Sequence, residues 1–331
     1  MIASSALKQW DPRSPDRGSN RDARDRAERA MRAYYDQNSR NPVASEFTVE
    51  AAYWVAKTKR AANDPRERQW WDSTKQAFEQ FRASAGAKAD GTSAALGSRQ
   101  AGFAAEAAYV ELDELISKNI DYDTGHQRFA GTTVEVLDQY RKSAAQAQAQ
   151  YDALQKVVDD YASPEWATAA IARQGSLYDS LRSGLYNVKP PALKMFDKKT
   201  EALLSRAENS DSPELQEQAD AVRMKVETGW REARDRELDS ADQVMVDRYG
   251  NAISLARRYN VSNPAVVRAT ARLAFFTDVI GEAKLQQYTG RVPSLEYNPG
   301  LFLRLRPGLV TAPKAEGMVP PAPPALPEKK E

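Results

Sequence analysis

The sequence predicts an all-α protein in which antiparallel helix pairs stack in series as an α-solenoid, with disordered termini. Helix starts recur in one form, a capping side chain before proline, at Asp64-Pro65, Ser163-Pro164, Ser212-Pro213 and Asn263-Pro264. Between the ends, the period-2 alternation that marks strands is almost absent. Apolar residues recur instead at helical spacing, so each helix is expected to bury one face.

Composition excludes several function classes. The 331 residues include 47 basic and 46 acidic ones, which leave a net charge of +1. Such a chain has no overall field to attract nucleic acid or an anionic membrane, so no nucleic-acid partner is expected. It contains no cysteine, which excludes disulfides and thiolate chemistry.

No apolar run reaches the roughly 18 residues needed to cross a bilayer, so no direct transmembrane segment is expected. The first residues, MIASSALKQWDPRSPDRGSN, lack the apolar region of a signal peptide. If this start is native, the expected location is cytoplasmic. If an export signal is missing from this chain, a periplasmic or outer-membrane-associated location is expected.

Four regions follow along the chain. Residues 1–20 are polar and predicted to be disordered, and residues 21–285 carry the helical pattern. Residues 286–310 are predicted to be irregular or extended, because GLFLRLRPGLV at 300–310 alternates and could lie as an extended segment on the helical body. Residues 311–331 hold six prolines and are predicted to be a disordered, polyproline-prone tail.

The first clear amphipathic helix lies at 69–81. Trp70, Trp71, Phe78 and Phe81 fall within one arc of about 120° when each residue advances by about 100°. Aromatic residues in this arrangement could form a ligand cage. At helical spacing they indicate core, which is the interpretation preferred here. The stretch 85–98 is predicted to be a loop from its Gly, Ser and Thr content.

Glycine and alanine are unusually frequent in YASPEWATAAIARQGSLYDSLRSGL, residues 161–185. Glycine inside a helix costs about 0.5–1 kcal/mol relative to alanine, so Gly175 needs a reason. We expect it to lie at a close helix crossing, with Ala169, Ala170 and Ala172 beside it. The motif EAAY at 50–53 returns at 106–109, which indicates internal repetition.

The run 151–181 resembles a tetratricopeptide repeat boundary: a helix ending in tyrosine, a Ser-Pro turn, then Ala170, Gly175, Tyr178 and Leu181 at the repeat's small and aromatic positions. Residues 130–285 are similar to the C-terminal region of large myxobacterial tetratricopeptide proteins, such as those of the adventurous gliding motility machinery. The resemblance implies degenerate repeats in a curved right-handed superhelix. It also implies a scaffold with peripheral association to the cell envelope.

The long stretch 212–260 is predicted to be an outer helix of the solenoid. Its apolar residues drift without the strict seven-residue frame that a coiled coil requires.

No residue is expected to be catalytic, cofactor-binding or metal-binding, and no cofactor is expected. His126, the only histidine, follows Asp121 and Asp123 in what is predicted to be a solvated loop. These two acids, and the pair Asp159 and Asp160, lack the remaining oxygen donors of a calcium loop. Helix-end solvation accounts for both pairs.

The sequence therefore predicts a non-enzymatic protein-protein interaction scaffold that binds protein partners, as extended peptides or assembly subunits, along a helical groove. The gliding motility resemblance adds an envelope-spanning motility or transport assembly as the setting. The alternative is the helical domain of a cell-wall hydrolase that uses an acidic residue such as Glu165 or Asp179.

Overall fold

The computed structural model describes residues 2–41, 44–89, 91–120 and 129–281, together with 283, 284 and 288. It confirms the all-α prediction for this part of the chain. The helices are α1 (Ile2–Gln9), α2 (Ser19–Asn38), α3 (Glu46–Ala61), α4 (Glu67–Ser84), α5 (Arg99–Asn119), α6 (Thr133–Tyr161), α7 (Pro164–Tyr186), α8 (Lys198–Glu208), α9 (Pro213–Tyr259) and α10 (Pro264–Ile280). Two short strands, β1 (Gly131–Thr132) and β2 (Leu193–Lys194), form a parallel pair.

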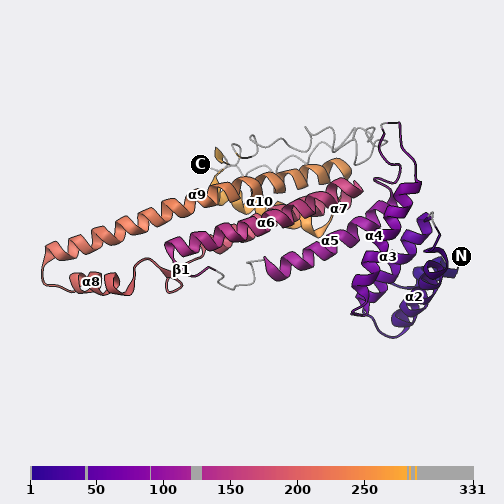
Figure 1. Ribbon diagram of the computed structural model, residues 1–331, viewed down its shortest axis with the longest axis horizontal. Coiled ribbons are helices and arrows are strands. Elements are labelled where there is room, and N and C mark those ends of the chain that lie inside the picture. Colours follow the sequence, from indigo (N-terminus) through magenta and orange to yellow (C-terminus); the bar gives the residue numbers. More distant parts are fainter. Residues whose placement is uncertain are drawn as a thin grey trace, which may run out of the picture.

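The molecule is elongated (Figure 1). Helices α6, α7 and α9 run along its length, and α1–α4 gather at one end. Helix α8 and the first part of α9 extend from the opposite end. Each of α1 to α6 packs on the next helix in the chain, while α9 packs on α7, α8 and α10.

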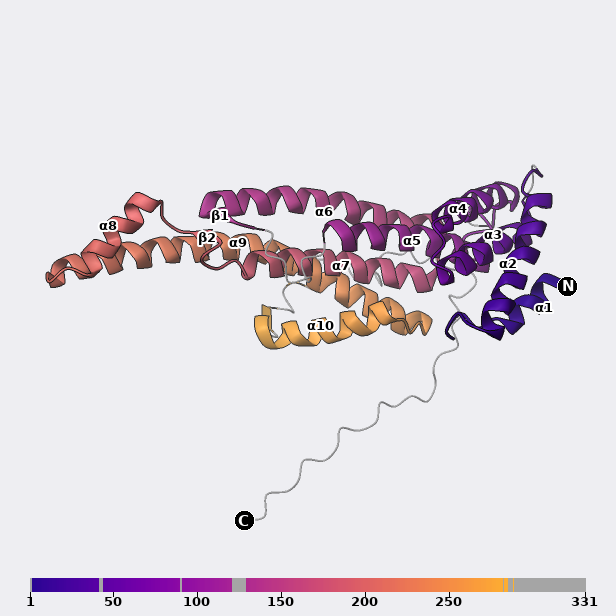
Figure 2. The same cartoon turned by 90° about the horizontal axis from the view of Figure 1, so that it is seen from below.

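A second set of contacts links alternate helices. Helix α5 touches both α3 and α7, and α7 touches α10. These helices therefore form a row, and α5, α7 and α10 follow one another side by side in Figure 2. Helices α4, α6 and α9 pack on the members of this row as partners.

Three of the four predicted Pro starts are confirmed. Pro164, Pro213 and Pro264 each begin a helix, and the Asn263 side chain accepts a hydrogen bond from the backbone N–H of Val266 at 2.9 Å. The start at Asp64 is wrong, because α4 begins at Glu67. The Asp64 carboxylate is occupied by the side chains of Lys59 and Arg66 and by the Arg66 backbone N–H.

The prediction of disorder over residues 1–20 is also wrong for the described part of that segment. Helix α1 occupies Ile2–Gln9, and Trp10 is buried with its ring 6.1 Å from that of Trp54. The Asn20 side chain closes the following turn by hydrogen bonds to the backbone of Asp11 at 3.0 and 3.1 Å. One buried tryptophan thus anchors a segment that its polar composition predicts to be disordered. Residues 286–287 and 289–331, including the 300–310 segment and the proline-rich tail, lie outside the described residues.

The main core runs between α5, α6, α7 and α9, where fully buried side chains include Leu154, Leu177, Leu181, Met245 and Leu255. The aromatic residues of α4 belong to the core, as predicted. Trp71 and Phe78 are buried, whereas Trp70 and Phe81 are half-buried and pack against buried clusters. The predicted close crossing at Gly175 is present as well. A Cβ atom there would lie 2.8 Å from Cδ1 and 2.9 Å from Cε1 of Tyr249 on α9.

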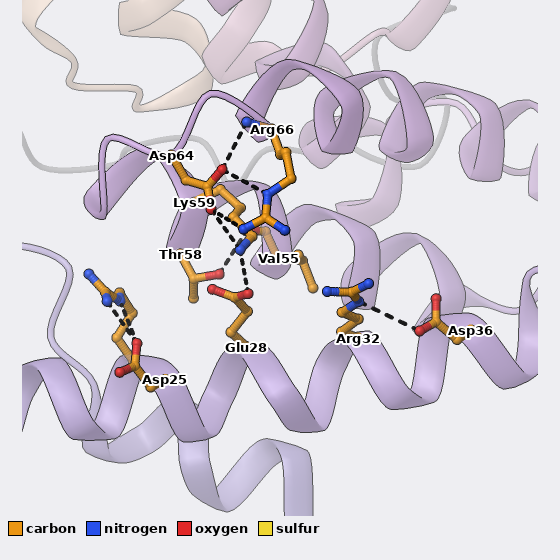
Figure 3. A network of polar contacts seen from close by, with 10 residues as sticks. Asp25, Glu28, Arg32, Asp36, Val55, Thr58, Lys59, Asp64 and Arg66 are labelled. Atoms are coloured by element: carbon orange, nitrogen blue, oxygen red, sulfur yellow. Dashed lines mark hydrogen bonds and ion pairs between the residues drawn. The ribbon is translucent and has the colours of Figure 1, made fainter.

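A buried lysine holds the N-terminal helices together (Figure 3). The Lys59 side chain on α3 is 6% exposed, and its Nζ lies 2.6 Å from Glu28 of α2 and 2.9 Å from Asp64 in the turn before α4. Asp64 also pairs with the Arg66 guanidinium at 2.7 Å. Hydrogen bonds from the side chain and backbone of Arg66, and then from Lys59, hold the pKa of Asp64 well below its ordinary value.

Asp247 is a second acid with a shifted pKa, but its pKa is raised, whereas that of Asp64 is lowered. Asp247 on α9 is 4% exposed, and its two carboxylate oxygens accept hydrogen bonds of 3.0 and 2.9 Å from the amide nitrogen of Asn251. The neighbouring Arg248 Nε lies 3.6 Å away. Burial raises the pKa of Asp247 to about 6, although Arg248 and Asn251 oppose the rise.

Asp247→Asn is expected to stabilise the protein at pH 7. Because the folded-state pKa is raised, the folded protein binds more protons than the unfolded chain between about pH 4 and 6, so stability falls as pH rises through that window. Removing the charge should add about 1–3 kcal/mol to the free energy of unfolding at pH 7 and almost nothing below about pH 4. Urea denaturation at both pH values measures this. Asp235→Asn, at an exposed site on the same helix, is the control. An equal effect of Asp247→Asn at pH 4 and pH 7 would contradict the prediction.

Candidate functional site

The strongest candidate site is a groove along α7, walled by α5 and α10, which we call the α7 groove. Its cavity volume is about 640 Å³. The lining residues come from α5 (Tyr109, Asp113, Ser117), α7 (Ala172, Arg173, Ser176, Asp179), α9 (Tyr249) and α10 (Ala265, Arg268, Ala269, Ala271, Arg272). Each helix of the row α5, α7 and α10 therefore contributes to one continuous site.

Helical spacing explains why these side chains meet. Ala172, Ser176 and Asp179 follow one another at i, i+4 and i+7, so they share one face of α7. Arg268 and Arg272 likewise share a face of α10. The floor is low because alanine and serine are small, while the walls carry the longer arginine side chains.

Ion pairs between neighbouring helices fix the walls. Arg173 on α7 lies 2.7 Å from Asp113 on α5 and donates a hydrogen bond of 2.9 Å to Ser117. Arg272 on α10 donates two hydrogen bonds of 2.6 Å to the two oxygens of Asp179 on α7. A bidentate arginine–carboxylate pair of this kind fixes orientation as well as distance. The three helices are thus held in register across the groove.

The same arrangement continues from α5 to α3. Tyr53, which ends the first EAAY motif, donates a hydrogen bond of 2.7 Å to Glu106, which begins the second. Lys57 pairs with the other oxygen of Glu106 at 2.6 Å. Burial, followed by the negative charge of Glu106, raises the pKa of Tyr53. The sequence repeat therefore marks a direct contact between two members of the helix row.

Three arginine side chains but only two aspartate side chains line the α7 groove. Asp113 and Asp179 are engaged by Arg173 and Arg272, whereas Arg268 is exposed and has no ion-pair partner among the described residues. In the part of the chain that the structure describes, the lining therefore carries one arginine, Arg268, without an acidic partner. It also presents serine and tyrosine hydroxyl groups to whatever occupies the groove.

The structure separates the acidic residues that the sequence suggests for a hydrolase. Asp179 lies in the α7 groove, but Arg272 and the Tyr249 hydroxyl, at 3.0 Å, already hydrogen-bond to its carboxylate. Glu165 is exposed at the start of α7 and does not line the groove. Asp159 and Asp160 lie in the last turn of α6. His126, Asp121 and Asp123 lie outside the described residues.

Within the described ranges, no group of three or more His, Cys, Asp or Glu side chains is placed to hold a metal ion. In the same part of the chain, every helix is too short or too polar to span a bilayer.

Sequence reasoning did not find Asp113, Arg173, Arg268, Arg272 or Tyr249. Their charges look like those of any solvated helix face, and the pairs they form join residues far apart in the chain. The i+4 spacing of Arg268 and Arg272 is the one local signal that they share a face.

No known protein-family model, curated protein or solved structure matches the chain.

Proposed function

We propose that the chain is a non-enzymatic protein-interaction scaffold, a solenoid of degenerate tetratricopeptide-like helix pairs that binds an extended segment of a partner protein in the α7 groove. The observation that carries this proposal is one groove lined by three helices of a single row, α5, α7 and α10. In a solenoid, successive helices of the same layer offer successive small pockets to an extended peptide.

Size and chemistry of the groove support a peptide ligand. Its volume of about 640 Å³ lies inside the range of roughly 300–1,000 Å³ that is usual for ligand sites. Hydroxyl groups and arginine side chains supply hydrogen bonds for peptide carbonyl groups and acidic side chains. The ion pairs of Arg173 and Arg272 preorganise the walls, which lowers the entropic cost of binding.

The row itself supports the solenoid. Helices α3, α5, α7 and α10 form one layer and α4, α6 and α9 the other, with α8 inserted between α7 and α9. Gly175 and the alanines around it allow the close approach that stacked helices need. From the sequence resemblance to gliding motility proteins, we further propose that the scaffold works in an envelope-spanning motility or transport assembly, with peripheral association to the envelope.

A non-enzymatic role is favoured over hydrolysis because Asp179 is bound by Arg272 and Tyr249. Both oxygens of the Asp179 carboxylate already accept hydrogen bonds from Arg272, and one also accepts from Tyr249, so the carboxylate is turned towards protein groups.

Ser176→Arg tests the proposal by filling the α7 groove from its floor. The full-length chain is used for affinity capture from the organism that encodes it, and captured proteins are then tested for direct binding. Ser176→Arg should weaken the binding of a captured partner by at least about tenfold. The matched control is Ser240→Arg, which places the same side chain at an exposed position on α9 outside the groove lining and should bind normally.

Equal binding by both variants would refute the groove as the site. Hydrolysis of a cell-wall substrate by the pure chain, abolished by Glu165→Gln or Asp179→Asn, would establish the enzyme instead.

A further inference from the structure

Among the described residues, nothing covers one apolar face of helix α10. Eleven of its 17 residues are Ala, Val, Leu, Ile or Phe, yet only Ala269 and Phe276 are buried. Val267, Phe275 and Val279 are 63%, 48% and 51% exposed. Together with the exposed Ala271 they follow one another at intervals of four or eight residues, so they lie on one face of the helix. We call these four residues the α10 stripe.

A helix this apolar is normally buried on several sides. Helix α10 packs on α7 and α9 through Ala269 and Phe276, while the α10 stripe remains open to solvent in the described part of the chain. Exposed apolar residues scattered singly need no explanation, but a continuous row along one helix indicates a contact surface.

The chain contains a segment suited to this surface. Residues 300–310, GLFLRLRPGLV, include six large apolar residues. In an extended conformation, Leu301, Leu303 and Leu305 would share one side and Arg304 and Arg306 the other. Asp278, exposed on the same face of α10 as the stripe, offers an opposite charge at its edge.

The stretch of chain between α10 and residues 300–310 is long enough for the segment to reach the α10 stripe. Tyr288 is held at α9 by a hydrogen bond of 2.5 Å from its hydroxyl to Asp239, and α9 packs on α10. From Tyr288 to Leu301 the chain can span up to about 43 Å when extended. Helix α10, with 17 residues, is only about 25 Å long. The segment therefore reaches any part of the α10 stripe.

We propose that residues 300–310 bind the α10 stripe of the same molecule and cover it. A tether of this length keeps the segment at a high effective concentration, which favours it over a second copy of the chain or another protein. This inference goes beyond the proposed function and requires no partner, since the α10 stripe shares only Ala271 with the lining of the α7 groove.

Hydrogen exchange in the full-length chain tests the contact. The triple variant L301S/L303S/L305S should raise the exchange rates of α10 amides by at least about tenfold, because the uncovered helix opens more readily. The matched control M318S/V319S/L326S removes three apolar side chains from the proline-rich tail and should leave α10 unchanged. Unchanged α10 exchange in the first variant would overturn the proposal.

Cross-linking identifies what occupies the stripe. Because the chain has no cysteine, the pair A271C/G300C can be joined with a short thiol-reactive linker without background. Fast linkage within one molecule, independent of protein concentration and at least about fivefold faster than for A271C/A322C, supports the proposal. Linked dimers, or α10 protection that rises with protein concentration, would assign the stripe to a second copy. Equal rates for the two pairs would likewise overturn it.

Discussion

Lys59→Met is expected to lower the free energy of unfolding by about 3–5 kcal/mol, because it strands carboxylates that are shielded from water. The side chains of Glu28 and Asp64 are only 17% and 16% exposed, and both lie within 2.9 Å of the Lys59 Nζ. Asp64 keeps its pairing with Arg66, so most of the loss falls on Glu28, whose carboxylate pairs with Lys59 at 2.6 Å. Methionine matches the shape of the lysine stem but supplies no charge.

The measurement is urea denaturation followed by tryptophan fluorescence. Lys142→Met, at an exposed site on α6, should change stability by less than about 0.5 kcal/mol. The double variant Glu28→Gln/Lys59→Met should be more stable than Lys59→Met alone, since it removes the stranded charge. A loss below about 1 kcal/mol for Lys59→Met would show that the network contributes little to stability.

The same network predicts the response to acid. The pKa of Asp64 is lowered in the folded state, so its contribution to stability is fully present above its ordinary value of 3.8 and is lost as pH falls below that value. Asp64 therefore makes the free energy of unfolding depend on pH only below about pH 4, whereas Asp247 does so between about pH 4 and 6.

Local signals in the sequence were enough to predict the helical character of the chain, three helix starts and one packing contact. Proline at the first helical position locates the starts of α7, α9 and α10, because its effect is confined to the first turn. Of the three predicted capping side chains, Asn263 makes a cap hydrogen bond, whereas Ser163 and Ser212 make none. A glycine inside an amphipathic helix points to a close crossing, and Tyr249 does lie against Gly175. Both inferences depend only on residues within a few positions of one another.

The groove could not be predicted in this way. Its walls depend on the pair Arg272 and Asp179, which are 93 residues apart, and on the contact of Arg173 with Ser117 over 56 residues. Each of these side chains alone resembles a solvated charge on a helix face. The predicted helix start at Asp64 was wrong for a related reason. Its capping pattern is local, but the side chains of Lys59 and Arg66 occupy the carboxylate that would have capped the helix. Likewise, Trp10 contacts Trp54 of α3, which is 44 residues away in the chain and gives no local signal.

Gly175→Leu is expected to destabilise the protein by about 1–3 kcal/mol, even though leucine is a better helix former than glycine by up to about 1 kcal/mol. The first added carbon would already lie 2.8 Å from the Tyr249 ring, which is closer than real Cβ contacts allow. Tyr249 cannot retreat freely, because its hydroxyl donates a hydrogen bond of 3.0 Å to Asp179, and Arg272 holds Asp179 in turn. The strain should therefore reach the floor and wall of the α7 groove.

The matched control for this substitution is Gly229→Leu. Gly229 is exposed on α9, and a Cβ atom there would meet nothing within 4 Å. The helix-propensity gain should then appear alone, as a stabilisation of up to about 1 kcal/mol. Denaturant unfolding of both variants gives opposite signs if close packing explains Gly175. A stabilising Gly175→Leu would mean that the α7–α9 crossing can widen at little cost, and glycine would then have no packing role at this position.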